Sequence, residues 1–264
     1  MPRIFHLRIF HLVWIIGLVA YAGVAAAGTL DDATIAAVDT AATVLTAMGK
    51  DSFKPGNKPP RQSDPAVKSL IDTVFDTGGL MALAPIAFPD LDKLNDWSLK
   101  VVGVGSVYVF AGSGIADPSQ LRDIDDKLQQ RLERNTVDYA PEMGRYLDSS
   151  MQVTQALVTA VMTEMALKPT EFKNPQVQTG LARIRSGLKQ TLNGVVTSLL
   201  TPGLDPAWIR GRLPPLNAIG PTAAKFLLQA DRKEVADIAN QVAAALSDAA
   251  VKQGLADFVK TLGI

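Results

Sequence analysis

The amino-acid sequence predicts an all-α protein, an irregular multi-helix bundle of about seven or eight helices that follows an N-terminal signal peptide. Three features of the 264-residue chain support this fold class. Helix-start signals recur along the chain, apolar residues repeat after them at steps of three and four, and the one strand-like segment has no convincing mate. We therefore expect helices to form the whole core.

Residues 1–27 have the features of a secretory signal peptide. Arg3 and Arg8 make the start basic, an uncharged run follows, and Ala25 and Ala27 form an A-x-A cleavage site. The run is shorter than the roughly 20 residues that a membrane-crossing helix needs. We therefore expect cleavage after Ala27 and export of the rest of the chain, rather than an uncleaved membrane anchor.

Cleavage at this point would remove both histidines, His6 and His11, from a chain that has no cysteine. The exported protein could then build no Ser-His-Asp or Cys-His catalytic site and no zinc site of His and Cys. We expect no metal and no cofactor. Small domains exported by the eukaryotic secretory route often rely on disulfides, which this chain cannot form. A bacterial periplasm is therefore the favoured location, and secretion is the alternative.

The charge of the exported chain bears on its partners. Two of the 26 basic residues and none of the 26 acidic residues lie in the leader, which leaves 24 against 26 and a net charge of −2. Nucleic-acid-binding proteins normally show a basic surplus. The sequence therefore argues against a nucleic-acid partner.

The exported chain divides into three parts. Residues 28–49 are expected to form an N-terminal helix that starts at Thr29, with Asp32 three residues later as a weak capping box. Residues 50–64, KDSFKPGNKPPRQSD, contain three prolines and few apolar side chains, so we expect a Pro-rich surface linker. Residues 65–264 follow as a single helical domain.

Further helix starts are marked by proline after a capping residue. Asp or Asn accepts hydrogen bonds from the free N–H groups of a first turn, where proline loses nothing. The four pairs are Asp64-Pro65, Asp117-Pro118, Asn174-Pro175 and Asp205-Pro206. The clearest apolar stripe follows the third pair, at Val177, Leu181, Ile184, Leu188, Leu192, Val195 and Leu199. By contrast, RGRLPPLNAIGP, residues 210–221, is rich in helix breakers and predicts a turn.

The segment KVVGVGSVYVFAGSGIA, Lys100 to Ala116, has the composition of a strand. A strand without a partner leaves its backbone unpaired, and no other segment offers a convincing mate. We therefore favour a buried helix, in which Gly105 and Gly112 permit close contact with another helix, and keep the strand as the alternative. The GVGSVY motif lacks the third glycine of a dinucleotide-binding fingerprint.

Two groups of aspartates could hold a calcium ion in an exported protein. The first is Asp90, Asp92 and Asp96, and the second is Asp117, Asp123, Asp125 and Asp126. Neither has the spacing of a calcium-binding loop, and both lie where a helix is expected to begin. Acids in a first turn are favoured by the helix dipole, so we interpret both groups as helix starts.

The segment DYAPEMGRY is the strongest candidate for a catalytic site. It places Glu142 and Arg145 between Tyr139 and Tyr146, and such a mixture of acid, base and aromatic rings could line a pocket. The same mixture also occurs at helix junctions whose polar groups are satisfied locally. We favour the junction and keep the four residues as weak catalytic candidates.

The segment LDPAWIRGRLPP is the candidate for binding a partner. Trp208, Arg210 and Arg212 are residue types that anchor interfaces and membrane surfaces. The alternative is a one-turn helix with Trp208 packed against the bundle. We favour the second interpretation, because one turn offers too little apolar area for peripheral membrane contact.

These observations favour a non-catalytic role over an enzyme. We expect an exported, periplasmic helical protein that binds a protein partner or a small apolar ligand between its helices. The alternative is a carboxylate-based hydrolase or lyase acting on cell-envelope material, with Glu142 and Tyr146 as its participants.

Overall fold

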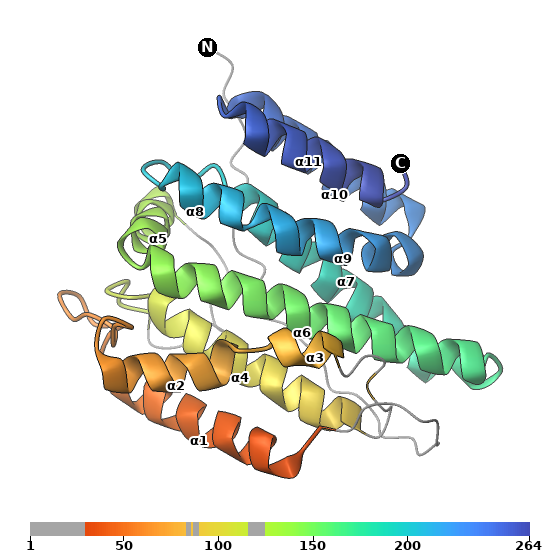
Figure 1. Ribbon diagram of the computed structural model, residues 1–264, viewed down its shortest axis with the longest axis horizontal. Helices are drawn as coiled ribbons and strands as arrows, with labels where there is room; N and C mark the ends of the chain where they lie inside the picture. The colour runs from red at the N-terminus through yellow and green to blue at the C-terminus, as the bar shows by residue number, and fades with distance from the viewer. Residues whose placement is uncertain (1–29, 83–85, 87–89, 116–124) are drawn as a thin grey trace.

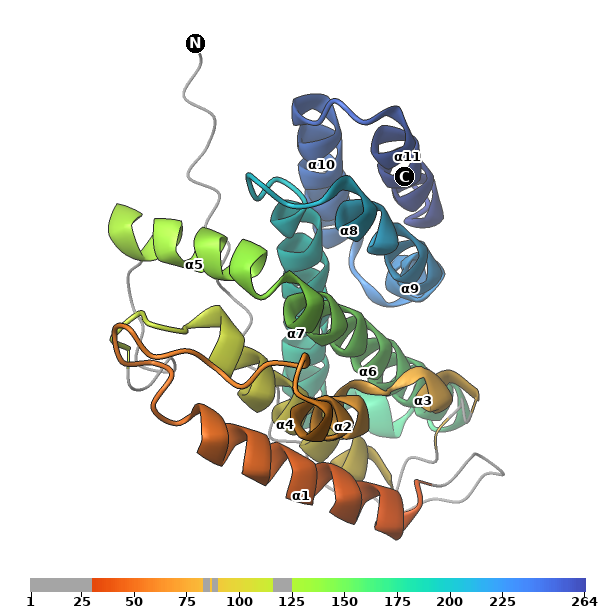
Figure 2. The ribbon, with the colours of Figure 1, turned by 60° about the vertical axis from the view of Figure 1, so that its left-hand side comes forward.

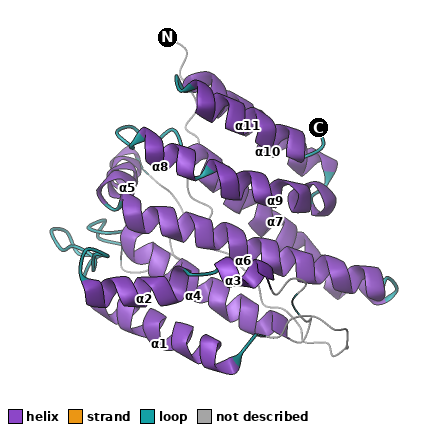
Figure 3. Cartoon of the chain, in the orientation of Figure 1, coloured by secondary structure: helices purple, strands orange, loops and turns teal. Residues whose placement is uncertain are grey.

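The computed structural model describes residues 30–82, 86, 90–115 and 125–264. Within these residues the protein is all-α, with eleven α-helices and no strand (Figure 3). Nine of the eleven are longer than ten residues, slightly more than the seven or eight expected. The leader, 1–27, lies outside the described residues.

The helices of the N-terminal half are α1 (Asp32–Gly49), α2 (Pro65–Phe75), α3 (Gly78–Ala82), α4 (Leu91–Val109), α5 (Asp126–Asp138) and α6 (Ala140–Leu167). Those of the C-terminal half are α7 (Pro175–Ser198), α8 (Pro206–Gly211), α9 (Leu213–Phe226), α10 (Gln229–Ala245) and α11 (Ala249–Thr261). A single 3₁₀ turn, Glu171–Lys173, precedes α7.

The helices stack in layers on both sides of α6 (Figures 1 and 2). On one side α4 packs along α6, and α1 and α2 pack against α4. On the other side α9 and α7 contact α6, and α11 and α10 form the far edge. One continuous cluster of buried apolar side chains runs through all the layers. No helix in the described part of the chain is long and apolar enough to cross a membrane.

Three of the predicted helix starts are confirmed. The side chains of Asp64, Asn174 and Asp205 each accept a hydrogen bond from the backbone N–H two residues on, and a proline opens each helix. The pair Asp117-Pro118 lies outside the described residues. The rule that combines a short acceptor with a following proline therefore locates α2, α7 and α8 correctly.

The N-cap of the first helix lies two residues later than expected. Asp31 is the N-cap of α1, and its carboxylate accepts a hydrogen bond of 3.2 Å from the N–H of Ala33. Thr29 lies outside the described residues. Asp31 is suited to the N-cap position, because its carboxylate accepts a hydrogen bond from a free first-turn N–H and is stabilised by the positive end of the helix dipole.

The prediction of a turn over 210–221 is wrong, because most of this segment belongs to α9. Pro214 and Pro215 lie in the first turn, where backbone N–H groups have no partner within the helix. Pro221 is the proline inside the helix. A cluster of prolines at a helix start thus resembles a breaker-rich loop in the sequence.

The segment from Lys100 to Val109 is helical, as the favoured interpretation expected, and forms the second half of α4. Gly105 lies where α4 crosses α6, and a Cβ at this position would collide with the ring of Tyr146. Gly112 does not serve a helix contact. Its φ of 64° places it in the turn after the helix.

Residues 50–64, which we call the strap, connect α1 to α2 and lie against the end of α4. The backbone carbonyls of Ser52 and Phe53 accept hydrogen bonds of 2.7 Å from the N–H groups of Gly112 and Gly114. Ser52 is buried. The strap is therefore fixed to the helices at its N-terminal half.

We expect Gly105→Ala to lower the free energy of unfolding by about 1–3 kcal/mol, because the added methyl group overpacks the contact with Tyr146. Gly103→Ala is the matched control on the same helix, since no atom lies within 4 Å of its Cβ position. Relief of glycine's backbone entropy should stabilise this variant by about 0.5–1 kcal/mol. Urea unfolding measures both, and equal effects would contradict the close α4–α6 contact.

Candidate functional site

Polar side chains gather where α4, α5, α6 and the strap meet. We call this set, Arg61, Tyr108, Asn135, Tyr139 and Glu142, the junction cluster. Four of its members are buried, and Arg61 is partly exposed. Each comes from a different element or from the corner between two, so the cluster exists only in the folded chain.

The local sequence builds the corner that carries Glu142. Tyr139 ends α5 and precedes α6, and Pro141 lies in the first turn of α6, where its missing N–H costs nothing. Glu142 follows in the same turn, where the helix dipole favours a carboxylate. The predicted helix junction in this segment is therefore present.

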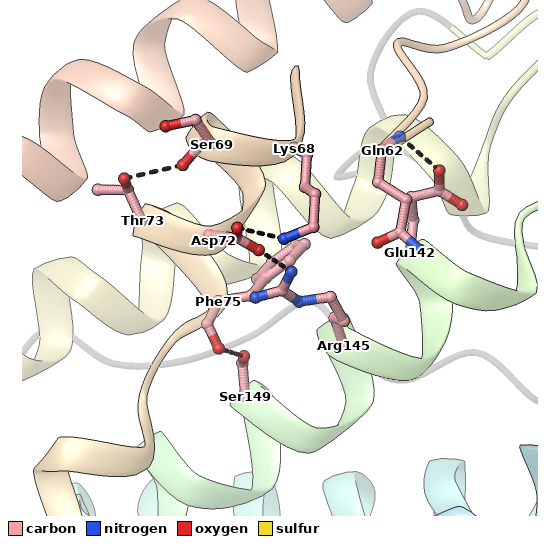
Figure 4. A network of polar contacts seen from close by, with 9 residues as sticks. All are labelled: Gln62, Lys68, Ser69, Asp72, Thr73, Phe75, Glu142, Arg145 and Ser149. Atoms are coloured by element: carbon pink, nitrogen blue, oxygen red, sulfur yellow. Dashed lines mark hydrogen bonds and ion pairs between the residues drawn. The ribbon is translucent and has the colours of Figure 1, made fainter. Parts of the chain in front are cut away.

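The carboxylate of Glu142 is completely buried, with 0% of the residue exposed. Its Oε1 accepts two hydrogen bonds from the strap, 2.9 Å from the N–H of Gln62 and 3.2 Å from Nε of Arg61 (Figure 4 shows the first). Its Oε2 has no hydrogen-bond partner among the described residues. A buried oxygen in this state costs about 1–3 kcal/mol.

Two tyrosines complete the cluster. The ring centroids of Tyr108 and Tyr139 lie 6.1 Å apart, and the guanidinium carbon of Arg61 lies 5.0 Å from the centroid of Tyr139. The hydroxyl of Tyr108 is buried without a hydrogen-bond partner in the described part of the chain. Burial raises the pKa of Tyr108, and the negative charge of Glu142 raises it further. Burial likewise raises the pKa of Tyr139.

Asn135 has a structural role in the cluster. Its amide nitrogen donates hydrogen bonds of 2.8 Å and 2.9 Å to the carbonyls of Val109 and Ala111. These carbonyls lie at the end of α4, where a helix has no N–H groups left to pair them. Asn135 therefore joins the end of α5 to the end of α4.

The structure does not bring the four catalytic candidates together. Glu142 and Tyr139 belong to the junction cluster, whereas Arg145 forms an ion pair with Asp72 of α2 (Figure 4). Tyr146 is buried between α6 and its neighbours, with its ring centroid 6.4 Å from that of Phe75. Burial raises the pKa of the Tyr146 hydroxyl.

Trp208 packs against α6, as the favoured interpretation of its segment describes. Its indole Nε1 donates a hydrogen bond of 2.5 Å to the carbonyl of Ala140. The guanidinium carbon of Arg212 lies 5.2 Å from the centroid of the Trp208 ring. Arg210 points elsewhere and pairs with Asp248 of the α11 cap at 3.0 Å.

Arg212 forms a partly buried ion pair with Asp148 of α6. It lies 2.8 Å from Oδ2 of Asp148 and donates a hydrogen bond to the carbonyl of Gly144. Burial raises the pKa of Asp148 from 3.8 to about 6, although the charge of Arg212 opposes this shift. Oδ1 of Asp148 is buried without a hydrogen-bond partner among the described residues.

The aspartate groups serve helix ends and ion pairs. Asp90 accepts a hydrogen bond of 2.9 Å from the N–H of Leu30 and pairs with Lys93, and Asp125 caps α5. Within the described residues, no group of three or more His, Cys, Asp or Glu side chains could hold a metal ion. Asp117 and Asp123 lie outside the described residues.

No protein-family model, curated protein or solved structure matches this chain. The arrangement of the chain's own side chains is therefore the basis for inferring its function. Sequence reasoning missed Arg61, Tyr108 and Asp148 as members of buried polar sites. Only the aromatic ring of Tyr108 in an apolar helix gave a signal, because Arg61 lies in a segment interpreted as a linker.

We expect Arg61→Ala to destabilise the protein by about 1–3 kcal/mol, because the buried carboxylate of Glu142 loses its cation. The double variant Arg61→Ala/Glu142→Gln has no buried charge at this site. Its loss of unfolding free energy should therefore be smaller than the sum of the losses in the two single variants. The coupling should be about 0.5–3 kcal/mol by a urea double-mutant cycle. A coupling of zero would contradict the ion pair.

We expect Asp148→Asn to change how stability depends on pH. Because the folded-state pKa of Asp148 is raised, its contribution is fully present below about pH 3.8 and is lost as the pH rises through about 6. The unfolding free energy of wild type minus that of the variant should therefore fall between pH 4 and pH 7. Urea unfolding at four pH values measures this difference, and a constant difference would contradict the shifted pKa.

Proposed function

We propose that this chain is an exported, periplasmic, non-catalytic protein that binds another protein through the outward face of α1. Export is inferred from the leader pattern of residues 1–27. The binding role is inferred from the chemistry of a single helix surface. That surface is the observation on which the proposal depends.

Helix α1 lies at one edge of the stack (Figure 2), and several of its apolar residues are exposed to solvent. We call this surface the α1 face, and it consists of Ala33, Ala36, Ala37, Val44, Ala47 and Met48, with Thr40 and Thr43 among them. Val44 and Met48 are 39% and 50% exposed. The spacing of three and four residues makes the face continuous along the helix.

The helices at the opposite edge of the stack have the surface that an edge helix normally shows. The exposed residues of α10 include Lys233, Glu234, Asp237, Asn240 and Gln241, and those of α11 include Lys252, Gln253 and Lys260. Helix α1 at one edge and helices α10 and α11 at the other all have a side that faces solvent, where charged residues are tolerated. The contrast therefore supports a binding role for the apolar edge.

The chemistry of the α1 face favours an uncharged apolar helix as its partner. The two acids beside it are already neutralised, since Asp32 pairs with Lys93 and Asp39 pairs with Lys100. The small alanine side chains let a second helix axis approach closely, because the distance between packed helices depends on the side chains at the contact. A small apolar ligand would need a concave site instead.

The structure offers no observation that favours the carboxylate-based enzyme. A general acid or nucleophile must reach its substrate, whereas Glu142 and Tyr146 are 0% and 3% exposed. One of the two carboxylate oxygens of Glu142, Oε1, already accepts two hydrogen bonds from the strap. We therefore propose only the binding role.

We expect a photo-crosslinking residue at Val44 to capture one protein of defined mass in the cell envelope. The same residue at Gln241 of α10 should capture none. Ala37→Glu places a charge on the α1 face and should reduce the adduct about tenfold, equivalent to about 1.4 kcal/mol of binding. Ala244→Glu is the matched control on α10 and should leave the adduct unchanged.

Absence of an adduct at Val44, or equal adducts at both positions, would contradict the α1 face as a binding surface. An adduct with twice the mass of the chain would show a second copy as the partner and would overturn the proposal of a different protein. Mass spectrometry of the purified chain tests export separately, since we expect residues 1–27 to be absent.

A further inference from the structure

The strap donates hydrogen bonds to only one of the two carboxylate oxygens of Glu142. Both Oε1 hydrogen bonds come from adjacent strap residues, Arg61 and Gln62. Oε2 and the hydroxyl of Tyr108 are fully buried and have no hydrogen-bond partner among the described residues. The site thus retains acceptor capacity that the chain's own arginine does not use.

Arg61 occupies this site incompletely. A guanidinium normally meets a carboxylate with two parallel N–H groups, one on each oxygen. Arg61 reaches only Oε1, through Nε and at 3.2 Å, while its side chain remains 40% exposed. Its guanidinium carbon lies 5.0 Å from the centroid of the Tyr139 ring, so a cation–π contact supplies the second half of the attachment.

The strap is fixed unequally along its length. In its N-terminal half, the carbonyls of Ser52 and Phe53 accept hydrogen bonds from Gly112 and Gly114, which follow α4. In its C-terminal half, Arg61 and Gln62 both donate hydrogen bonds to Oε1 of Glu142, Arg61 also stacks on Tyr139, and Pro59 is buried. The hydrogen bonds that hold the N-terminal half involve neither Arg61 nor Gln62, so release of the two bonds to Glu142 would leave them in place.

We propose that the site occupied by Arg61 is a binding site for an arginine side chain of the protein partner, and that the strap is its internal competitor. A partner arginine can engage both carboxylate oxygens and stack on Tyr139, which Arg61 cannot do from its tethered position. Arginine is specified over lysine because only the planar guanidinium offers two parallel donors and a face for stacking. This inference rests on the proposed binding role but uses a different surface from the α1 face.

Hydrogen exchange of the full-length folded chain tests this inference without the natural partner. The probe is the tripeptide acetyl-Gly-Arg-Gly-amide, and the control peptide carries lysine in place of arginine. We expect the arginine peptide to speed exchange of the Gln62 amide about tenfold, because this N–H loses its bond to Glu142 when the strap leaves. The lysine peptide should have no effect.

Variants assign the effect to Glu142. Glu142→Gln should abolish the response, whereas Asp72→Asn, which removes a partly exposed acid paired with Lys68 and Arg145, should retain it. If Glu142→Gln does not fold, the variant Arg61→Lys tests whether Arg61 competes with the peptide for Glu142. It weakens the internal competitor, so the arginine peptide should act at a concentration about tenfold lower.

An unchanged Gln62 exchange rate with the arginine peptide, or an equal response to both peptides, would overturn the inference. So would an Arg61→Lys variant that responds at the same concentration as wild type. The measurement also distinguishes this failure from failure of the proposed function. Crosslinking at Val44 reports on the α1 face alone and does not depend on the strap.

Discussion

Every layer of this protein depends on α6. Its 28 residues span about 42 Å at 1.5 Å per residue, and its sides pack against α4 and α9. Small residues permit these contacts, since a side chain at Gly144 would collide with Arg212 and Trp208. Polar groups fix the register, as when the Ser149 hydroxyl donates to the carbonyl of Phe75 (Figure 4). Without α6, the faces of α4, α7 and α9 that pack against it would be exposed.

The polar groups buried on α6 connect this architecture to function. Glu142 holds the strap, and Asp148 holds Arg212 at the start of α9, so an ion pair secures each side of the helix. Such pairs contribute little to net stability, because the hydration lost by the buried group offsets the attraction between the charges. They do specify where loops and short helices dock. The site under the strap and the apolar α1 face both lie on the N-terminal side, whereas the exposed residues of α10 and α11 include several charged and amide side chains.

Local rules predicted the helical architecture from the sequence, and long-range contacts supplied the rest. Caps followed by proline located α2, α7 and α8, because a cap and a first turn are adjacent in the chain. The same local view misread α9, whose prolines fill a first turn. Glu142 was recognisable as a candidate, but its partner Arg61 lies 81 residues earlier, and no spacing rule links them. The α1 face likewise became visible only when packing showed which side of the helix is covered.

Native-state hydrogen exchange across a series of urea concentrations tests the central position of α6 most directly. If α6 is the shared support of both sides, its most protected amides should open with the free energy of global unfolding. The buried amides of α4 and α9 should converge to the same value. Protection of α7 and α9–α11 that persists after α6 has exchanged would show an independent C-terminal unit and would contradict the single core built around α6.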